Sequence, residues 1–222
     1  MSDHLEDLPL FPLHAVLFPF ERLQLHVFES RYCEMMKHCL DYDAPFGVVL
    51  IRHGEEINDT PEPFLVGTAC RIEQVHNYPD GRMHISVIGE RRFRIRRLDE
   101  SQPYLIGQTE PVTEADYKNT PRILALSSRL AETFGILITG MLSRPDFNID
   151  VQLPDDPMMR SFLVARFLNL ENPIKQRLLE CTDTEQRLAD LIPLVEQQII
   201  ESNAQVVQKL TPEAMAEWIT PN

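Results

Sequence analysis

The chain has 222 residues, of which 43% are hydrophobic and 25% are charged, and these values are ordinary for a globular protein with a sizeable core. Its formal net charge is −13, and both halves share the acidic excess, which disfavours nucleic acid and anionic membranes as partners. No apolar run approaches the roughly 20 residues of a membrane helix, and the acidic N-terminus does not resemble a secretory signal, so no membrane partner is predicted.

The first predicted elements are two short strands, residues 8–11 and 23–28. The second strand alternates apolar and polar side chains, as a half-buried strand does. Three prolines lie in or between these strands: Pro9, Pro12 and Pro19. Because proline lacks a backbone donor, they predict irregular or edge backbone here rather than a central strand. Ser30 is predicted to cap a helix that follows.

A buried strand and a hairpin come next. Residues 46–51 are a continuous apolar run, typical of a strand buried on both faces, and residues 52–63 are predicted to form an exposed loop. The turn Asn77–Gly81 then joins two strands, of which the second is long and alternates apolar side chains with polar ones. Gly89 interrupts that second strand and predicts a bulge or a bend. A last strand spans residues 104–112, and together these elements predict an antiparallel barrel or rolled sheet.

From about Thr113 the periodicity becomes helical. Successive apolar stripes predict four or so helices, the first of which begins at Pro121 and the last of which continues to Leu210. Pro193 is predicted to kink or break that last helix. Trp218, in the tail, either docks on the parent fold or is presented to a partner.

Several motifs occur in a particular order in the first half. They are LPLFP at residues 8–12, FP at 18–19, ESRY at 29–32, VGTA at 66–69, PDG at 79–81 and GERRFRI at 89–95. Their order and spacing resemble the Lon N-terminal domain family, over roughly residues 8–112 and more loosely over the helical remainder. The resemblance implies a PUA-like rolled sheet and a role in recognising unfolded or degron-bearing polypeptides.

No catalytic motif is found. The sequence contains no phosphate-binding G-x-x-x-x-G-K-[ST] loop, no G-x-S-x-G and no H-E-x-x-H. Full-length Lon-like proteases use an ATPase domain and a serine–lysine peptidase domain, and none of the four lysines lies in a context resembling that peptidase. The chain is also too short for either domain, so we predict a non-enzyme: the front module standing alone.

Neither metals nor cofactors are predicted. The seven histidines are scattered, and no pair combines metal-ligand spacing with a supporting carboxylate. The four cysteines form no C-x-x-C pair and are predicted to be reduced, mostly buried thiols, which suits the cytoplasm.

A cluster of arginines on the long hairpin strand has three interpretations. Arg92, Arg94 and Arg96 share one face of that strand in an otherwise acidic protein. They pair with carboxylates on neighbouring strands, or they anchor backbone carbonyls or a carboxylate of a bound peptide through the guanidinium fork. An RNA-binding patch is the third interpretation, and the absence of an aromatic stacking platform and the negative net charge disfavour it.

We therefore predict an α+β protein, with a PUA-like rolled β-barrel lobe (residues 1–115) followed by a helical-bundle lobe (residues 116–222). The predicted function is non-catalytic binding of unfolded or extended polypeptide. The alternatives are an adaptor that docks on a separate protease or chaperone, and a small-ligand or RNA-binding PUA-like protein. Self-association is compatible with each. The candidate binding residues, chosen from their positions, are Phe18, Phe20, Phe28, Tyr32, Arg92, Arg94 and Arg96.

Overall fold

The computed structural model describes residues 5–56, 61–115, 120–141 and 153–209. These residues form an α+β protein that divides into two compact units. The first unit comprises residues 1–116 and 170–183, and the second comprises residues 117–169 and 184–222. The predicted behaviour of the tail around Trp218 lies outside the described residues.

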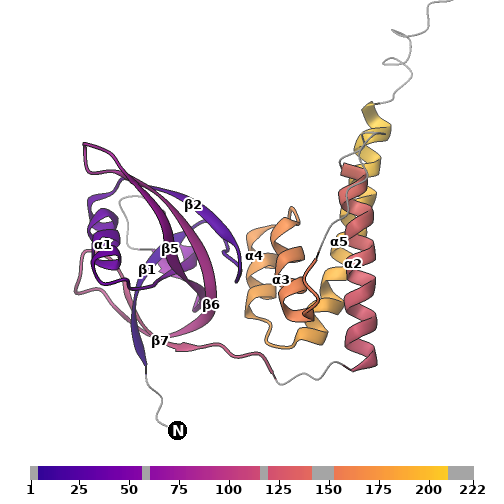
Figure 1. The fold of residues 1–222 in the computed structure, drawn as a ribbon, viewed down its shortest axis with the longest axis horizontal. Coiled ribbons are helices and arrows are strands. Elements are labelled where there is room, and N and C mark those ends of the chain that lie inside the picture. The colour runs from indigo at the N-terminus through magenta and orange to yellow at the C-terminus, as the bar shows by residue number, and fades with distance from the viewer. Residues whose placement is uncertain (1–4, 57–60, 116–119, 142–152, 210–222) are drawn as a thin grey trace, which may run out of the picture. The chain divides into compact units, whose positions relative to one another are not determined.

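The first unit is built on one mixed, mostly antiparallel sheet (Figure 1). Its strands are β1 (Glu6–Leu13), β2 (Arg22–Val27), β3 (Phe46–His53), β4 (Glu62–Pro63), β5 (Val66–Asn77), β6 (Met83–Asp99) and β7 (Ile106–Pro111). The order β1-β7-β6-β5-β3 returns to β1, because β1 also pairs with β3. Of the described strands, β2 and β4 are therefore additions to this closed set, β2 on β6 and β4 on β3.

Strand β1 corrects the expectation that its prolines mark edge or irregular backbone. The strand pairs with β7 up to Pro9 and with β3 from Leu10 onward. The Leu10 N–H donates to the Leu105 carbonyl on the β7 side. Backbone nitrogens point to alternate sides along a strand, so the Pro12 nitrogen faces β7 and the Pro9 nitrogen faces β3. Each missing donor thus faces the side on which β1 has no partner at that residue.

The long hairpin β5–β6 confirms the predicted turn and the predicted irregularity at Gly89. Gly81, in the turn, has a φ of 88°. Cys70 lies opposite Gly89 while Ala69 lies opposite Arg91, so β6 carries one extra residue at this point. A Cβ built on Gly89 would lie 2.5 Å from the Phe18 carbonyl oxygen, which shows why a glycine is needed where the chain crosses so closely.

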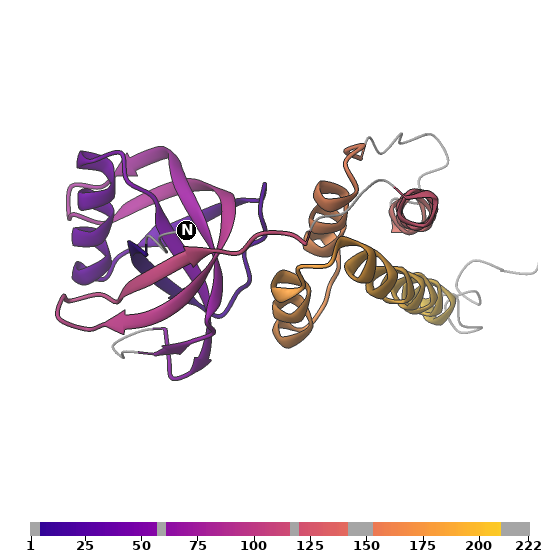
Figure 2. The ribbon, with the colours of Figure 1, turned by 90° about the horizontal axis from the view of Figure 1, so that it is seen from below.

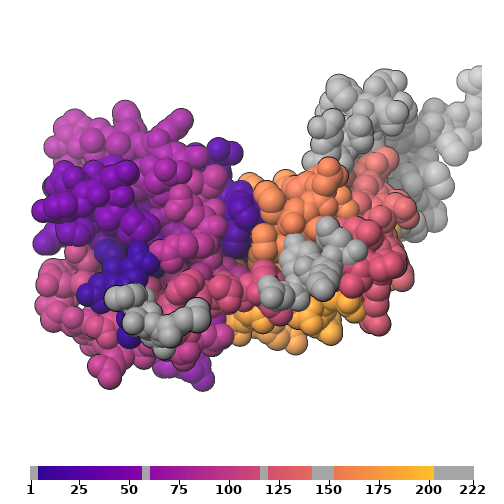
Figure 3. Space-filling model, turned by 60° about the horizontal axis from the view of Figure 1, so that its bottom comes forward, coloured from indigo at the N-terminus to yellow at the C-terminus, as the bar shows by residue number. Residues whose placement is uncertain are grey.

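Helix α1 (Ser30–Asp41) packs against one side of the strands, at the outer edge of the unit (Figures 1 and 2). It buries Tyr32, Met35, Met36 and Cys39 against side chains of β2, β3, β5 and β6. The prediction that Ser30 caps this helix is wrong: Glu29 occupies the capping position, without a side-chain hydrogen bond, and Ser30 is already helical. In the space-filling view, α1 and the strands form one continuous surface of this unit (Figure 3).

Helix α4 (Asn172–Glu180) belongs to the first unit, although the sequence placed it in the helical half beyond residue 115. The Gln176 amide donates to the Val66 carbonyl at 3.0 Å, and the Asn172 amide donates to the His14 carbonyl at 2.6 Å. The segment therefore adheres to strands that precede it by more than one hundred residues.

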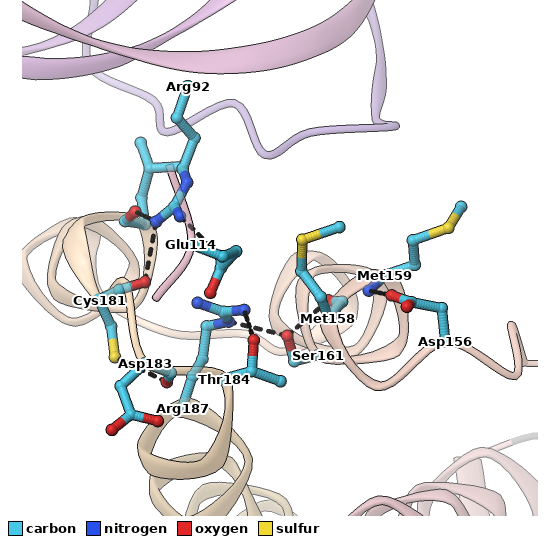
Figure 4. Close-up of polar contacts among 11 residues, drawn as sticks. Arg92, Glu114, Asp156, Met158, Met159, Ser161, Cys181, Asp183, Thr184 and Arg187 are labelled. Atoms are coloured by element: carbon cyan, nitrogen blue, oxygen red, sulfur yellow. Dashed lines mark hydrogen bonds and ion pairs between the residues drawn. The ribbon is translucent and has the colours of Figure 1, made fainter. Parts of the chain in front are cut away.

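The second unit contains α2 (Pro121–Met141), α3 (Pro157–Phe167) and α5 (Thr184–Lys209). Its core includes Arg187, which is fully buried. The Arg187 Nε donates to Ser161 Oγ at 2.8 Å (Figure 4). The Arg187 guanidinium lies 4.1 Å from the Phe162 ring centroid. Helix α5 continues through Pro193, so of the predicted kink or break the break is excluded, and the kink stays a prediction.

One helix of the described chain, α2, is long and apolar enough to cross a membrane by length and composition alone. The sequence predicted none, because no apolar run in it approaches roughly 20 residues. A core helix satisfies the same criterion, and α2 buries Leu130 and Phe134 while Arg129 pairs with Glu196 of α5 at 2.8 Å.

Candidate functional site

Three of the predicted binding residues are buried in the interior of the first unit. Phe18, Tyr32 and Arg92 are only 1%, 5% and 4% exposed. Burial raises the pKa of the Tyr32 hydroxyl to about 12, and its ring packs 4.5 Å from the ring of Phe11. These side chains hold the fold together, and a ligand on the surface does not reach them.

Arg92 binds backbone carbonyls, as one interpretation proposed, but they belong to its own chain. One guanidinium nitrogen, Nη1, donates to the carbonyls of Leu179 and Cys181 at 2.6 and 2.8 Å. The other, Nη2, pairs with the Glu114 carboxylate at 2.6 Å (Figure 4). The guanidinium fork therefore joins β6 to the end of α4.

The other arginines of β6 favour the interpretation in which they pair with neighbouring carboxylates. Arg91 pairs with Glu6, and Arg96 pairs with Glu110 of β7. Arg96 holds the pKa of Glu110 below its ordinary value. Arg94 is half-buried, so the structure spreads the three candidate arginines from the interior to the surface.

The exposed candidates are Phe20 and Phe28, and they flank opposite ends of β2. Phe20 is 43% exposed and Phe28 is 48% exposed. The six residues of β2 separate them by roughly 20 Å at the rise of an extended strand, so the two rings do not form one pocket.

Phe20 is held in a left-handed conformation, with a φ of 66°. Its N–H donates to the Gly89 carbonyl at 2.8 Å, and the Gly89 N–H donates to the Glu21 carbonyl at 2.8 Å. A bulky residue at positive φ is rare and is maintained only where its surroundings impose it. The result is an aromatic ring presented to solvent from a fixed backbone.

Strand β2 has one free edge, since among the described strands it pairs only with β6. The Tyr78 N–H donates to the Arg82 carbonyl, so the backbone groups of Arg82 face β5. Because backbone groups alternate sides along a strand, the even-numbered residues at this end of β6 face β5 and the odd-numbered ones face β2. Leu25 lies opposite Ile85 and therefore bonds to β6. Gln24 and its even-numbered neighbours direct their N–H and C=O groups away from β6, toward the free edge.

Phe28 also lines a cavity of about 430 Å³. The other lining residues come from the first turns of α1 and from the β5–β6 turn: Ser30, Cys33, Glu34, Lys37, Asp80, Gly81 and Arg82. This volume lies within the range of small-ligand pockets. The lining is mixed, with two cations, two carboxylates and an aromatic ring, as in sites that accept both polar and apolar parts of a ligand.

The chemistry of this cavity suits binding rather than bond cleavage. Hydrogen bonds from the Arg82 backbone and side chain hold the pKa of Asp80 below its ordinary value, so this carboxylate is a poor base. Burial raises the pKa of the Cys33 thiol, which reduces its nucleophilicity at neutral pH. All four cysteines are free thiols, and three of them are buried.

Sequence reasoning missed a row of histidines beside Phe28. His26 lies opposite His84, and His84 lies opposite His76, on three adjacent strands. The ring of Phe28 stacks on His26 at 5.8 Å between centroids. Only the strand register could have revealed the row, because the three residues are 50 and 8 positions apart in the chain.

Residues 7–197 match the family model of the ATP-dependent protease La (LON) substrate-binding domain. The chain is similar to Lon protease of Escherichia coli (strain K12), with 23% identity over 197 residues, which cover 87% of this chain and 25% of that protein. Lon protease 2 of Herpetosiphon aurantiacus is 28% identical over 196 residues, covering 87% and 24%. The chain thus spans about a quarter of the length of these relatives.

Two solved structures share the fold. The Lon N-terminal domain protein of Xanthomonas campestris superposes with a TM-score of 0.63 at 28% identity, covering 85% of this chain and 98% of that one. The N-terminal domain of the Mycobacterium avium complex Lon protease gives a TM-score of 0.64 at 18% identity, covering 86% and 98%. The second likeness shows the fold alone.

Proposed function

The chain belongs to the family of LON substrate-binding domains, and we propose that it binds extended polypeptide segments along the free edge of β2 without catalysing a reaction on them. Family membership supports substrate recognition in general. The proposal adds the place of binding, the extended conformation of the ligand and the non-catalytic role.

The observation that carries this proposal is the half-paired state of β2. The closed set of strand pairings leaves β2 and the two-residue β4 as additions, and among the described strands the side of β2 away from β6 is unpaired along all six of its residues. An extended peptide can pair with such an edge through main-chain hydrogen bonds, which bind many sequences alike. Phe20 and Phe28 lie at the two ends, where they can contact apolar side chains of the added strand.

Several finer features stay predictions. The description of the first unit as a PUA-like rolled barrel agrees with its cyclic strand pairing. The helical-bundle description of residues 116–222 and the cytoplasmic location rest on the sequence. The partner belongs to the class of unfolded or extended polypeptides, because an edge strand recognises backbone rather than one sequence.

The test uses Gln24→Pro with Gln24→Thr as its matched control. Proline removes the Gln24 N–H, which is directed away from β6, so the hydrogen bonds between β2 and β6 stay intact. We expect Gln24→Pro to weaken binding of a fluorescently labelled, permanently unfolded polypeptide by up to about tenfold, the equivalent of one net hydrogen bond. Gln24→Thr keeps the donor and should bind as the unaltered chain does, with anisotropy as the readout.

A second pair of variants tests the aromatic ends. Phe28→Ala should weaken the same polypeptide several-fold, while Tyr42→Ala, which removes an aromatic ring that is 72% exposed at the far end of α1, should have no effect. Circular dichroism confirms that each variant is folded. Unchanged binding by folded Gln24→Pro and Phe28→Ala would reject the β2 edge as the binding site.

A further inference from the structure

Three imidazoles form a straight row across the sheet of the first unit. His26 of β2, His84 of β6 and His76 of β5 occupy directly opposed positions on adjacent strands. All three are exposed, whereas their strand neighbours Val27, Met83 and Ile85 are buried beneath α1. The row therefore lies on the solvent face of the sheet.

His26 and His84 lie closer together than the type of strand pairing alone would place His84 and His76. His76 and His84 form a hydrogen-bonded pair by the alternation that begins at the Tyr78–Arg82 bond, so His84 and His26 form a non-hydrogen-bonded pair. Side chains of non-hydrogen-bonded pairs approach more closely. Accordingly, the His26 and His84 ring centroids lie only 4.4 Å apart.

Tyr78 occupies the middle of this group. Its ring centroid lies 4.9 Å from that of His76, 5.5 Å from that of His84 and 6.4 Å from that of His26. The three imidazoles contact other rings. Within the described part of the chain, their nitrogens make no hydrogen bond or ion pair. Six ring nitrogens are thus available at one place on the surface.

We propose that His26, His84 and His76 bind one transition-metal ion of the kind that imidazole prefers, with zinc as the probe. Neutral imidazole is a good ligand for zinc, nickel and copper. No three metal-binding groups of the described residues already converge on one point, so the site forms by rotation of exposed side chains. His26 and His84 form the initial chelate, and His76 joins when the Tyr78 ring moves aside.

The arginines near the row are paired with carboxylates. Arg82 lies over the Tyr78 ring and is paired with Asp80, and Arg22, farther along β2, is paired with Glu73. Both of these arginines therefore have a carboxylate partner, which limits their repulsion of a divalent ion. An imidazole nitrogen binds a metal ion only when it carries no proton, so zinc affinity should fall as the pH is lowered.

Isothermal titration calorimetry with zinc chloride tests the site, on the full chain without a histidine tag. We expect one ion per chain, and His84→Gln, which removes the central ligand of the row, should weaken binding by at least about tenfold. His76→Gln should weaken it less, because the His26–His84 pair is retained. His38→Gln, which removes an exposed histidine of α1 outside the row, should leave binding unchanged.

Wild-type zinc affinity in folded His84→Gln, or equal losses in His84→Gln and His38→Gln, overturns the proposal. So does zinc affinity that stays constant between pH 7.5 and pH 5.5, because imidazole ligation must compete with protons. Polypeptide binding by the β2 edge is measured with chelator present and without zinc. Failure of one proposal is therefore distinguishable from failure of the other.

Discussion

At the scale of single residues, charge and aromatic character do not predict exposure. Arg92 and Arg96 were predicted to share one face of β6, yet Arg92 is buried and Arg96 is exposed, at a point where the β6–β7 register shifts. Phe18 and Phe20 lie two positions apart, and one is in the core while the other is in solvent. The difference lies in what covers each position, and for Arg92 that cover is the segment containing α4.

Arg92→Met should cost about 3–5 kcal/mol of folding free energy, because it removes the buried guanidinium that binds the Glu114 carboxylate and two backbone carbonyls. Arg91→Met, which removes an exposed pair with Glu6, should change stability by less than about 1 kcal/mol. Urea denaturation of both variants measures the difference. Equal midpoints for the two variants would show that Arg92 does not hold α4.

At the scale of elements, glycines mark where the backbone is crowded and where it is not. Gly89 lies against the backbone of Phe18, while Gly135, inside α2, has no atom within 4 Å of a built Cβ. The same substitution should therefore have opposite effects at the two positions.

Gly89→Ala should destabilise the chain by about 1–3 kcal/mol, since the new methyl group meets a carbonyl oxygen at 2.5 Å and forces β6 away from the 18–21 segment. The two hydrogen bonds that join Gly89 to Phe20 and Glu21 would lengthen. Thermal unfolding measures the loss. An unchanged melting temperature would mean that the 18–21 segment can move without cost.

Gly135→Ala should stabilise α2 by about 0.5–1 kcal/mol, because alanine lowers the backbone entropy lost on helix formation and meets no neighbour. Hydrogen exchange of the α2 amides should slow while exchange in β5 and β6 is unaffected. Faster exchange in α2 would indicate a contact that glycine alone permits.

At the scale of the whole molecule, the two units are not consecutive in the chain. The first unit takes residues 170–183 from within the helical half, and the second takes what lies on either side of them. Cys39 and Tyr32 are buried against strands that are distant in the sequence, and their burial affects stability at high pH.

Stability should fall between about pH 9 and pH 11. Burial raises the pKa of Cys39 from 9.0 to about 11, so the folded chain keeps a proton that the unfolded chain releases. The contribution is fully present below pH 9 and is lost as pH rises toward 11, and Tyr32 extends the decline toward pH 12. Urea midpoints across this range measure it, and Cys39→Ala should give a shallower decline. An equally steep curve in that variant would assign the effect to other groups.

The sequence by itself determined most of the elements of this protein, although the loop predicted for residues 52–63 contains the end of β3 and strand β4. The alternation along β6, the turn before it, the irregularity at Gly89 and the helix start at Pro121 all follow from local periodicity and backbone chemistry, and the structure contains each of them. The family resemblance depended on the same local motifs, and the match over residues 7–197 confirms it.

Only the tertiary structure decided which residues meet. Whether Arg92 is exposed depends on α4, whether β2 has a free edge depends on where the strand pairing closes, and whether three histidines form a row depends on the register of three strands. Each of these is set by contacts between residues far apart in the chain. A local pattern predicts the face of a strand or helix on which a side chain lies, but it does not predict which residues pack against that face.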